Sequence, residues 1–260
     1  MNKFLKLTLI LFTVIVLLAA GIFFWKRHTA LIPVDNFKKE TVKNLNVGAV
    51  IKEDREKDTG KNNESPSDKT ILPERILIKV PFTTQAPDAN WDERHEEACE
   101  EASLIMLAYY IQNKKLNREI AEKEIQDLIN FQLEKYGDYK DSDAAGIVKL
   151  AADYYNIKNL KVIYDFEKAE IKKQLAKGNP IIVPAAGRKL GNPNFTYPGP
   201  LYHALALVGY DGNTIITNDP GTRKGEGYKY NIDVLFKAIH DFPGNIDEIE
   251  KGRKAMIIIE

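Results

Sequence analysis

The sequence contains a single cysteine, Cys99, among 260 residues. An intramolecular disulfide is therefore excluded, and the thiol is left to fill a hydrophobic core or to perform chemistry. The sequence also lacks an excess of charge of either sign, because 37 basic residues balance 37 acidic ones. No bulk charge favours nucleic acid, and we expect no nucleic-acid partner.

One long hydrophobic run is present near the N-terminus. Leu7 to Trp25 is 19 residues without a charge, with Lys3 and Lys6 before it and Lys26 and Arg27 after it. At about 1.5 Å per residue, such a run nearly spans a bilayer core of roughly 30 Å. The run therefore predicts a single transmembrane helix, a membrane anchor that occupies residues 1–25.

A cleavable signal peptide is the alternative for this segment, because such peptides also have a basic start and an apolar centre. Their apolar stretch is shorter and ends at a small-x-small cleavage site. Here the small residues Ala19 to Gly21 are followed by Ile22 to Trp25, so hydrophobicity resumes where cleavage would occur. We expect an uncleaved anchor. Its short N-terminal tail favours an extracytoplasmic location for the rest of the chain, although positive charge on both sides leaves the orientation open.

Two further regions follow the hydrophobic run. Residues 26–69 form a polar, charged linker, in which Asp54 to Lys69 contains no large apolar residue. From Thr70 the pattern changes, and residues 70–260 alternate helix and strand signals without an internal repeat. A stretch of this length predicts one domain with a substantial core.

Helix signals dominate the first part of this domain and strand signals the second. Apolar spacing and capping residues predict helices at Glu96–Tyr110, Arg118–Tyr136, Ala144–Tyr155 and Phe166–Lys177. Apolar runs predict strands at Lys161–Tyr164, Ile181–Ala185, Tyr202–Gly209, Thr214–Asn218, Tyr228–Asn231 and Ala255–Ile259. Early helices packed on a largely antiparallel sheet make an α+β domain.

Cys99 lies near the start of the first predicted helix. The unpaired backbone amides of a helix N-terminus favour a thiolate, which is the nucleophilic form of cysteine. Glu97, Glu100 and Glu101 oppose this effect, because further negative charge nearby disfavours ionisation of the thiol. We therefore expect either that these carboxylates point away from the sulfur, as part of a solvated helix start, or that the histidine compensates for their charge.

His203 is the best candidate for a proton acceptor, because it opens an apolar run and is therefore held on a strand. A hairpin with a three-residue loop and Gly212 in the left-handed conformation places Asp219 directly opposite His203. Opposed residues on one sheet face have Cβ atoms about 4.5 to 5.5 Å apart. Asp219 is then able to orient the imidazole, as the third member of a catalytic triad does. A one-residue slip of register offers Asn218 instead.

The oxyanion that forms on a carbonyl requires hydrogen-bond donors. Gln85 precedes the cysteine and is the candidate side-chain donor, alongside the backbone N–H of Cys99. Trp91 lies between the two in sequence and either covers the site or supports the loop.

Four ordered blocks of this sequence resemble the C-39-like peptidase family. They are Val80–Pro87, Glu97–Ser103, Tyr202–Asp211 and Asn218–Thr222, within a resemblance that runs from about Ile78 to Ile259. The resemblance implies a papain-like cysteine peptidase fold that acts on a peptide or protein substrate and needs no cofactor. It also implies roles for four matching residues: Cys99 as nucleophile, His203 as base, Asp219 as orienting residue and Gln85 as oxyanion donor.

Other interpretations of the same residues stay open. The same triad serves acyltransferases and deamidases, and a non-catalytic peptide-binding module on a membrane tether retains it as a pocket. A lone cysteine is also commonly core filler. His95 and Cys99 are four residues apart and, with His203 and Asp219, match the number of ligands in a zinc site, although no compact metal motif is present. Substrate sequence, endo or exo cleavage and oligomeric state do not follow from the sequence.

Overall fold

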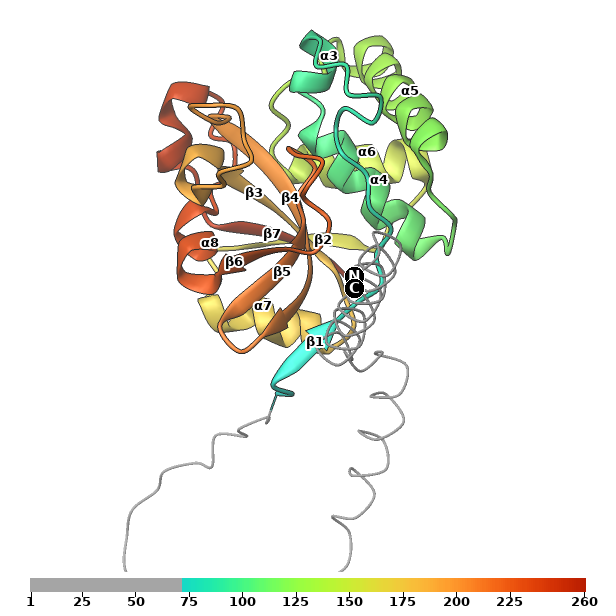
Figure 1. Cartoon of the computed structure of the whole chain (residues 1–260). Coiled ribbons are helices and arrows are strands. Elements are labelled where there is room, and N and C mark those ends of the chain that lie inside the picture. Colours follow the sequence, from blue (N-terminus) through green and yellow to red (C-terminus); the bar gives the residue numbers. More distant parts are fainter. Residues whose placement is uncertain (1–71) are drawn as a thin grey trace, which may run out of the picture.

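Apolar strands from the second half of the chain pair into one sheet (Figure 1). The computed structural model describes residues 72–260, in which every strand pair is antiparallel and the order is β2-β7-β3-β4-β5-β6, with β1 paired to the end of β4. The strands are β1 (Arg75–Leu77), β2 (Leu160–Tyr164), β3 (Ile181–Ala186), β4 (Tyr202–Asp211), β5 (Thr214–Asn218), β6 (Tyr228–Asn231) and β7 (Ala255–Ile259).

Helices cover both faces of the sheet. They are α3 (Glu93–Glu96), α4 (Cys99–Ile111), α5 (Arg118–Tyr136), α6 (Ala144–Tyr155), α7 (Lys168–Ala176) and α8 (Ile232–Ala238), with 3₁₀ helices η1 (Gly187–Leu190) and η2 (Ile246–Lys251). The helices α4, α5 and α6 share one hydrophobic core with β2, β3 and β7, whereas α7 and α8 pack on the other face. The prediction of an α+β domain with helices packed on an antiparallel sheet is confirmed.

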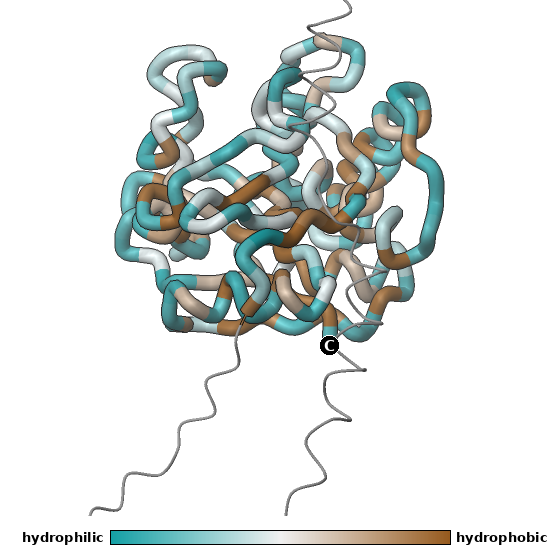
Figure 2. Tube along the Cα trace, turned by 60° about the horizontal axis from the view of Figure 1, so that its bottom comes forward, coloured by the Kyte–Doolittle hydropathy of each residue, from teal (hydrophilic) through white to brown (hydrophobic). Residues whose placement is uncertain are grey.

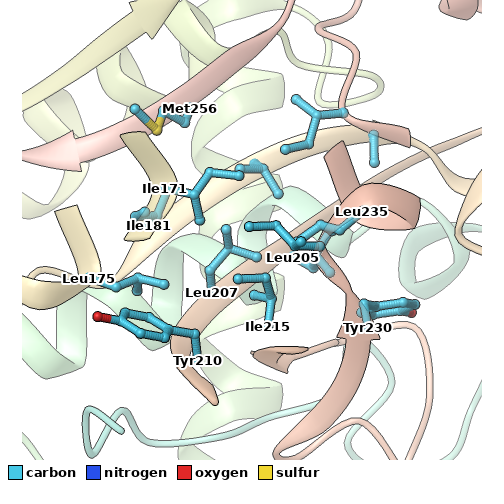
Figure 3. Close-up of a cluster of buried hydrophobic side chains, with 14 of the residues drawn as sticks. Ile171, Leu175, Ile181, Leu205, Leu207, Tyr210, Ile215, Tyr230, Leu235 and Met256 are labelled. Carbon is cyan, nitrogen blue, oxygen red and sulfur yellow. The ribbon is translucent and has the colours of Figure 1, made fainter. Parts of the chain in front are cut away.

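The strand β4 runs through the centre of the sheet and contributes side chains to both faces. Leu205 and Leu207 belong to the core beneath α7 and α8 (Figure 3), whereas Ala206 and Val208 pack against Met106 of α4. This is the two-residue alternation of a strand that is buried on both sides. Hydrophobic stretches accordingly cross the middle of the domain, and hydrophilic ones dominate its outer loops (Figure 2).

Capping residues fix two helices at their predicted bounds. The side chain of Asn117 accepts a hydrogen bond from the backbone N–H of Ile120 at the start of α5, and Gly137 ends that helix with a φ of 84°. Asp143 caps α6 through the backbone N–H of Gly146. Each cap satisfies backbone groups that have no partner within the helix, so the bounds of α5 and α6 were readable from sequence.

The first predicted helix, Glu96–Tyr110, is wrong in one respect that shapes the site. The chain forms two helices here, α3 and α4, separated by Glu97 and Ala98. Ala98 has φ −96° and ψ 26° and gives no side-chain cap to α4. Cys99 is consequently the first residue of α4, where backbone N–H groups have no acceptor one turn earlier in the same helix.

The membrane anchor predicted for residues 1–25 and the linker predicted for residues 26–69 lie outside the described residues. Within residues 72–260, no helix is both long and apolar enough to cross a bilayer.

Candidate active site

A cleft of about 770 Å³ opens where the N-terminus of α4 meets the start of β4. Cys99 and His203 both line it, and Gln85 and Trp91 line it from the segment that precedes α4. The opposite rim comes from the segment between η1 and β4, which includes Phe195, and from the turn after β5. The structure therefore brings together, around one cavity, residues that are more than 100 positions apart in the chain.

The thiol of Cys99 is buried, and only 5% of the residue is exposed. Its Sγ donates a hydrogen bond to Oε2 of Glu100 at 2.9 Å. Among the hydrogen bonds of the described residues, none joins this sulfur to His203. The nucleophile predicted from sequence thus lines the cleft, but its proton points to a carboxylate.

The position of Glu100 corrects the expectation that the acidic residues form a solvated helix start. Glu100 is 2% exposed and Glu101 is fully buried. Burial, followed by the Glu100 charge and its hydrogen bond, raises the pKa of the Cys99 thiol well above its ordinary value, although the backbone amide of Ala204 acts in the opposite direction. The resting thiol is therefore protonated at neutral pH, against the effect expected from a helix N-terminus.

His203 and Asp219 form a buried pair, with His203 Nε2 and Asp219 Oδ1 2.8 Å apart. The carboxylate accepts three further hydrogen bonds, from Tyr230 Oη at 2.6 Å, Asn192 Nδ2 at 3.1 Å and the backbone N–H of Gly221 at 3.0 Å. With Nε2 facing Asp219, Nδ1 is the imidazole nitrogen that is left for proton transfer.

Charge and hydrogen bonds keep Asp219 ionised despite its burial. Burial alone raises the pKa of the Asp219 carboxyl, but the His203 ring and the hydrogen bonds from His203, Tyr230 and the Gly221 backbone outweigh it and lower the pKa below its ordinary value. A buried carboxylate with this many donors is able to orient the imidazole and stabilise its protonated form.

The route by which Asp219 reaches His203 differs from the predicted hairpin. The loop between β4 and β5 has two residues, Gly212 and Asn213, and the register shifts between Leu207 and Gly209. Gly212 does have the predicted left-handed conformation, with a φ of 53°. Within β4 and β5, Asn218 faces Ala206, so the predicted register, with Asp219 directly opposite His203, is wrong.

The pair forms because the chain turns after β5. Asp219 directly follows the last residue of β5, and its Oδ1 accepts the Gly221 N–H, which is the geometry of an Asx turn. Gly221 lies so close to the His203 ring that an added Cβ would be 2.9 Å from Cε1. Asn218, the alternative partner, instead donates to the backbone carbonyl of Val80 at 3.2 Å.

Gln85 lines the cleft, but its side-chain amide hydrogen-bonds to the backbone and is not left free for an oxyanion. Its Nε2 donates to the backbone carbonyls of His95 at 2.8 Å and Glu96 at 2.9 Å. Both amide hydrogens are thereby used to hold the α3–α4 junction, while the buried Oε1 has no partner. The backbone N–H of Cys99 makes no hydrogen bond within residues 72–260 and is the donor left for an oxyanion. The oxyanion role of Gln85 stays a prediction.

His95 does not join the cysteine. Its buried ring lies between Asp92, with Nδ1 and Oδ1 2.7 Å apart, and Glu122, with Nε2 and Oε1 3.0 Å apart. In the described part of the chain, no group of three or more His, Cys, Asp or Glu side chains is arranged to hold a metal ion. The zinc interpretation that combined His95 with Cys99 therefore finds no support there.

Sequence reasoning missed two neighbours of Asp219, Tyr230 and Asn192. Both lie in segments whose sequence carries no chemical signal, because Tyr230 reads as an ordinary strand aromatic and Asn192 as part of a loop rich in Gly, Asn and Pro. Phe195, from the same loop, packs edge to face on His203 with ring centroids 5.2 Å apart. These contacts show that the loop before β4 supports the His203–Asp219 pair as well as lining the cleft.

One family model and two solved structures are similar to this chain. A model of the family described as "Peptidase_C39 like family" matches residues 77–242. A protein from Bacillus anthracis described as a C39-like peptidase is similar in structure, with 15% identity, a TM-score of 0.48, and coverage of 72% of this chain and 98% of the other. Xylellain, a cysteine protease from Xylella fastidiosa, is similar with 14% identity, a TM-score of 0.40, and coverage of 76% and 90%. No curated protein matches the chain. Because the family match spans more than half of the residues, the chain belongs to the Peptidase_C39 like family of cysteine peptidases.

Proposed function

We propose that this protein hydrolyses peptide bonds through Cys99, with His203 as base and Asp219 as the residue that orients the imidazole. The observation that carries the proposal is the buried His203–Asp219 hydrogen bond of 2.8 Å beside a cleft that Cys99 also lines. A nucleophile, a base and an orienting group around one cavity are the minimum for covalent hydrolysis of an amide.

The reaction follows from the free atoms of the site. The thiol proton passes to Nδ1 of His203, and the sulfur attacks the substrate carbonyl carbon, forming a C–S bond and an oxyanion that the Cys99 N–H is placed to stabilise. Collapse breaks the C–N bond, and His203 returns its proton to the leaving amine. Water, deprotonated by His203, then releases the carboxylic acid and regenerates the thiol. These steps balance without a cofactor.

The size and the lining of the cleft support a peptide substrate. Its volume of about 770 Å³ falls within the range of clefts that bind drug-sized ligands. Its lining includes the acidic residues Glu97 and Asp141 and the basic residues Arg188 and Arg223, so a bound chain meets charge of both signs. A peptide or protein is thus the substrate class that we propose.

The test is hydrolysis of a peptide library by the full chain and by its Cys99→Ala variant. We expect cleavage by the wild type and none by the variant, whose melting temperature should stay close to that of the wild type because the sulfur is replaced by a smaller group. Cleavage that persists in the purified variant would reject the mechanism. Addition of hydroxylamine separates hydrolysis from acyl transfer, since an acyltransferase forms a hydroxamate in preference to the acid.

One observation favours a second function, a peptide-binding module without catalysis. The raised pKa of the Cys99 thiol reduces its reactivity, as expected of a pocket in which the triad is only retained. Binding of library peptides to the Cys99→Ala variant, together with a wild type that never turns them over, would support this function. Release of new amino groups from these peptides by the wild type would instead support the peptidase function.

We further propose that Leu7 to Trp25 anchors the protein in a membrane and places the domain outside the cytoplasm. The support is the absence of charge over 19 residues. The full chain should resist extraction by alkaline carbonate, whereas a double Val14→Arg and Leu18→Arg variant should be extracted, because each arginine disfavours insertion by about 2.5 to 3.5 kcal/mol. Protease added to intact cells tests the side, and protection of the domain would contradict the extracytoplasmic location.

A further inference from the structure

The contact between Cys99 and Glu100 has no part in the reaction described above. Glu100 is 2% exposed, and its two oxygens have different partners. Oε2 accepts the Cys99 thiol at 2.9 Å, while Oε1 accepts the backbone N–H of Ser142 at 2.9 Å. The Ser142 contact fixes the carboxylate in place from the loop between α5 and α6, so Oε2 is held against the sulfur.

Burial, followed by the Glu101 charge, raises the pKa of the Glu100 carboxyl well above its ordinary value, and no cation within residues 72–260 offsets this effect. Among the described residues Glu100 forms no ion pair. The ionisable groups that act on it or respond to it are all acids, namely Cys99, Glu101, Asp141 and Tyr202. A thiolate and a carboxylate side by side in such surroundings repel one another strongly, because burial leaves little solvent to screen them. The two groups therefore compete for one proton.

On the basis of the proposed function, we propose that Glu100 is a positioning residue that holds the Cys99 thiol in a resting orientation, directed away from His203. Catalysis then requires the Sγ–Glu100 hydrogen bond to be exchanged for one to Nδ1 of His203. Cys99 and His203 line the same cleft, so the exchange takes place within the site. The free protein consequently has a protonated, slowly reacting thiol, and the nucleophile forms when a substrate occupies the cleft.

The substitution Glu100→Gln reverses this effect with little change of shape. The Gln Oε1 is still able to accept the Ser142 N–H, whereas Nε2 replaces the acceptor beside Cys99 with a donor. A donor stabilises a thiolate, and the competing charge is gone. The variant should thus ionise Cys99 at lower pH while keeping the loop in place.

The experiment measures the rate of iodoacetamide alkylation of the full chain from pH 5 to 10. Cys99 is the only cysteine, so the label reports this site alone. We expect the midpoint of the profile to fall by about 1 pH unit or more in Glu100→Gln, which is roughly a tenfold gain in rate at neutral pH. The matched control is Glu101→Gln, which removes a charge one residue further along. Because Glu101 accepts from Gln132 and does not contact the sulfur, its shift should be less than half as large.

Two results would overturn the proposal. One is an unchanged or higher midpoint in a folded Glu100→Gln protein; the other is an equal shift in both variants, which would indicate a general charge effect. If Glu100→Gln fails to fold, Glu100→Asp retains the charge but shortens the side chain away from Sγ, and an unchanged midpoint there refutes the hydrogen bond. Alkylation needs no hydrolysis, so a protein that cleaves no peptide but shows the Glu100 effect separates failure of the proposed function from failure of this inference.

Discussion

The imidazole of His203 and the carboxylate of Asp219 are joined by a hydrogen bond of 2.8 Å although the two residues do not face one another across β4 and β5. Their side chains are 1% and 0% exposed. A pair buried this completely cannot exchange its partner for water, so loss of either group leaves the other unsatisfied. The two side chains are thus expected to depend on one another for their positions in the site.

Asp219→Ala should reduce kcat/KM by about 10² to 10⁴-fold, because His203 then loses the group that orients its ring and stabilises its protonated form. Asp219→Asn should restore part of this loss, since Oδ1 of the amide still accepts from Nε2 but carries no charge. Steady-state kinetics on a cleaved library peptide measure both. A folded Asp219→Ala protein with wild-type kcat/KM would remove Asp219 from the mechanism.

Gly221→Ala should disturb the His203 ring directly. An added Cβ would lie 2.9 Å from His203 Cε1 and 2.8 Å from Phe195 Cε1, closer than such atoms approach. Displacement of a catalytic group by about 1 Å costs up to 10²-fold in rate, so we expect kcat to fall by at least about tenfold. The measurement is kcat beside the melting temperature.

The matched control for that change is Gly227→Ala in the same loop, which meets no atom within 4 Å but has a φ of 63°. It should cost about 1 to 2 kcal/mol of stability, the penalty of a left-handed conformation, and leave kcat unchanged. Equal loss of kcat in both variants would indicate that the loop as a whole, and not the contact with His203, controls activity.

The limits of α5 and α6 were readable from sequence because capping residues determine them. The side chains of Asn117 and Asp143 accept hydrogen bonds from the first turns of α5 and α6, and Gly137 ends α5. These contacts are local, so no distant part of the chain is needed to place the two helices. The strands were likewise found from apolar runs, except for the three-residue β1. The four candidate residues were singled out by their chemistry, and the resemblance to a peptidase family implied the same four, which lie around or behind the cleft.

The register between β4 and β5 and the burial of Glu100 could not be predicted from the sequence. The register shift between Leu207 and Gly209 adds one residue to β4 relative to β5, and no local sequence pattern predicts it. Glu100 was expected in solvent because two acids at a helix start normally remain hydrated. Its burial depends on the Ser142 N–H, 42 positions away, and only the folded chain supplies that donor. The contact that sets the state of the nucleophile was therefore invisible in the sequence.

Gln85→Ala should loosen the junction between α3 and α4. The backbone carbonyls of His95 and Glu96 lose their donor, and a buried unpaired polar group costs about 1 to 3 kcal/mol. We expect the free energy of unfolding in urea to fall by that amount and kcat/KM to fall with it. Gln112→Ala at the far end of α4 is the control, expected to leave kcat/KM unchanged. If Gln85→Ala lowers kcat and leaves stability unchanged, Gln85 acts as the oxyanion donor and not as a brace.

Glu101 makes the stability of the domain depend on pH. Burial, only partly offset by the hydrogen bond from Gln132 at 2.5 Å, raises the pKa of Glu101 to about 7. In the unfolded chain this carboxyl titrates near 4.3, so between about pH 4.3 and 7 the folded state binds more protons than the unfolded state. Stability contributed by the protonated group is complete below pH 4.3 and is lost as pH rises through about 7.

Glu101→Gln should remove this pH dependence, because an amide keeps the acceptor for Gln132 and never ionises. We expect the difference in unfolding free energy between variant and wild type to grow in favour of the variant from pH 4.5 to 7.5, as measured by urea denaturation at fixed ionic strength. A difference that stays constant over this range would mean that Glu101 titrates alike in both states. The carboxylate is then solvated in the folded protein, and the first turn of α4 is more open than its 0% exposure indicates.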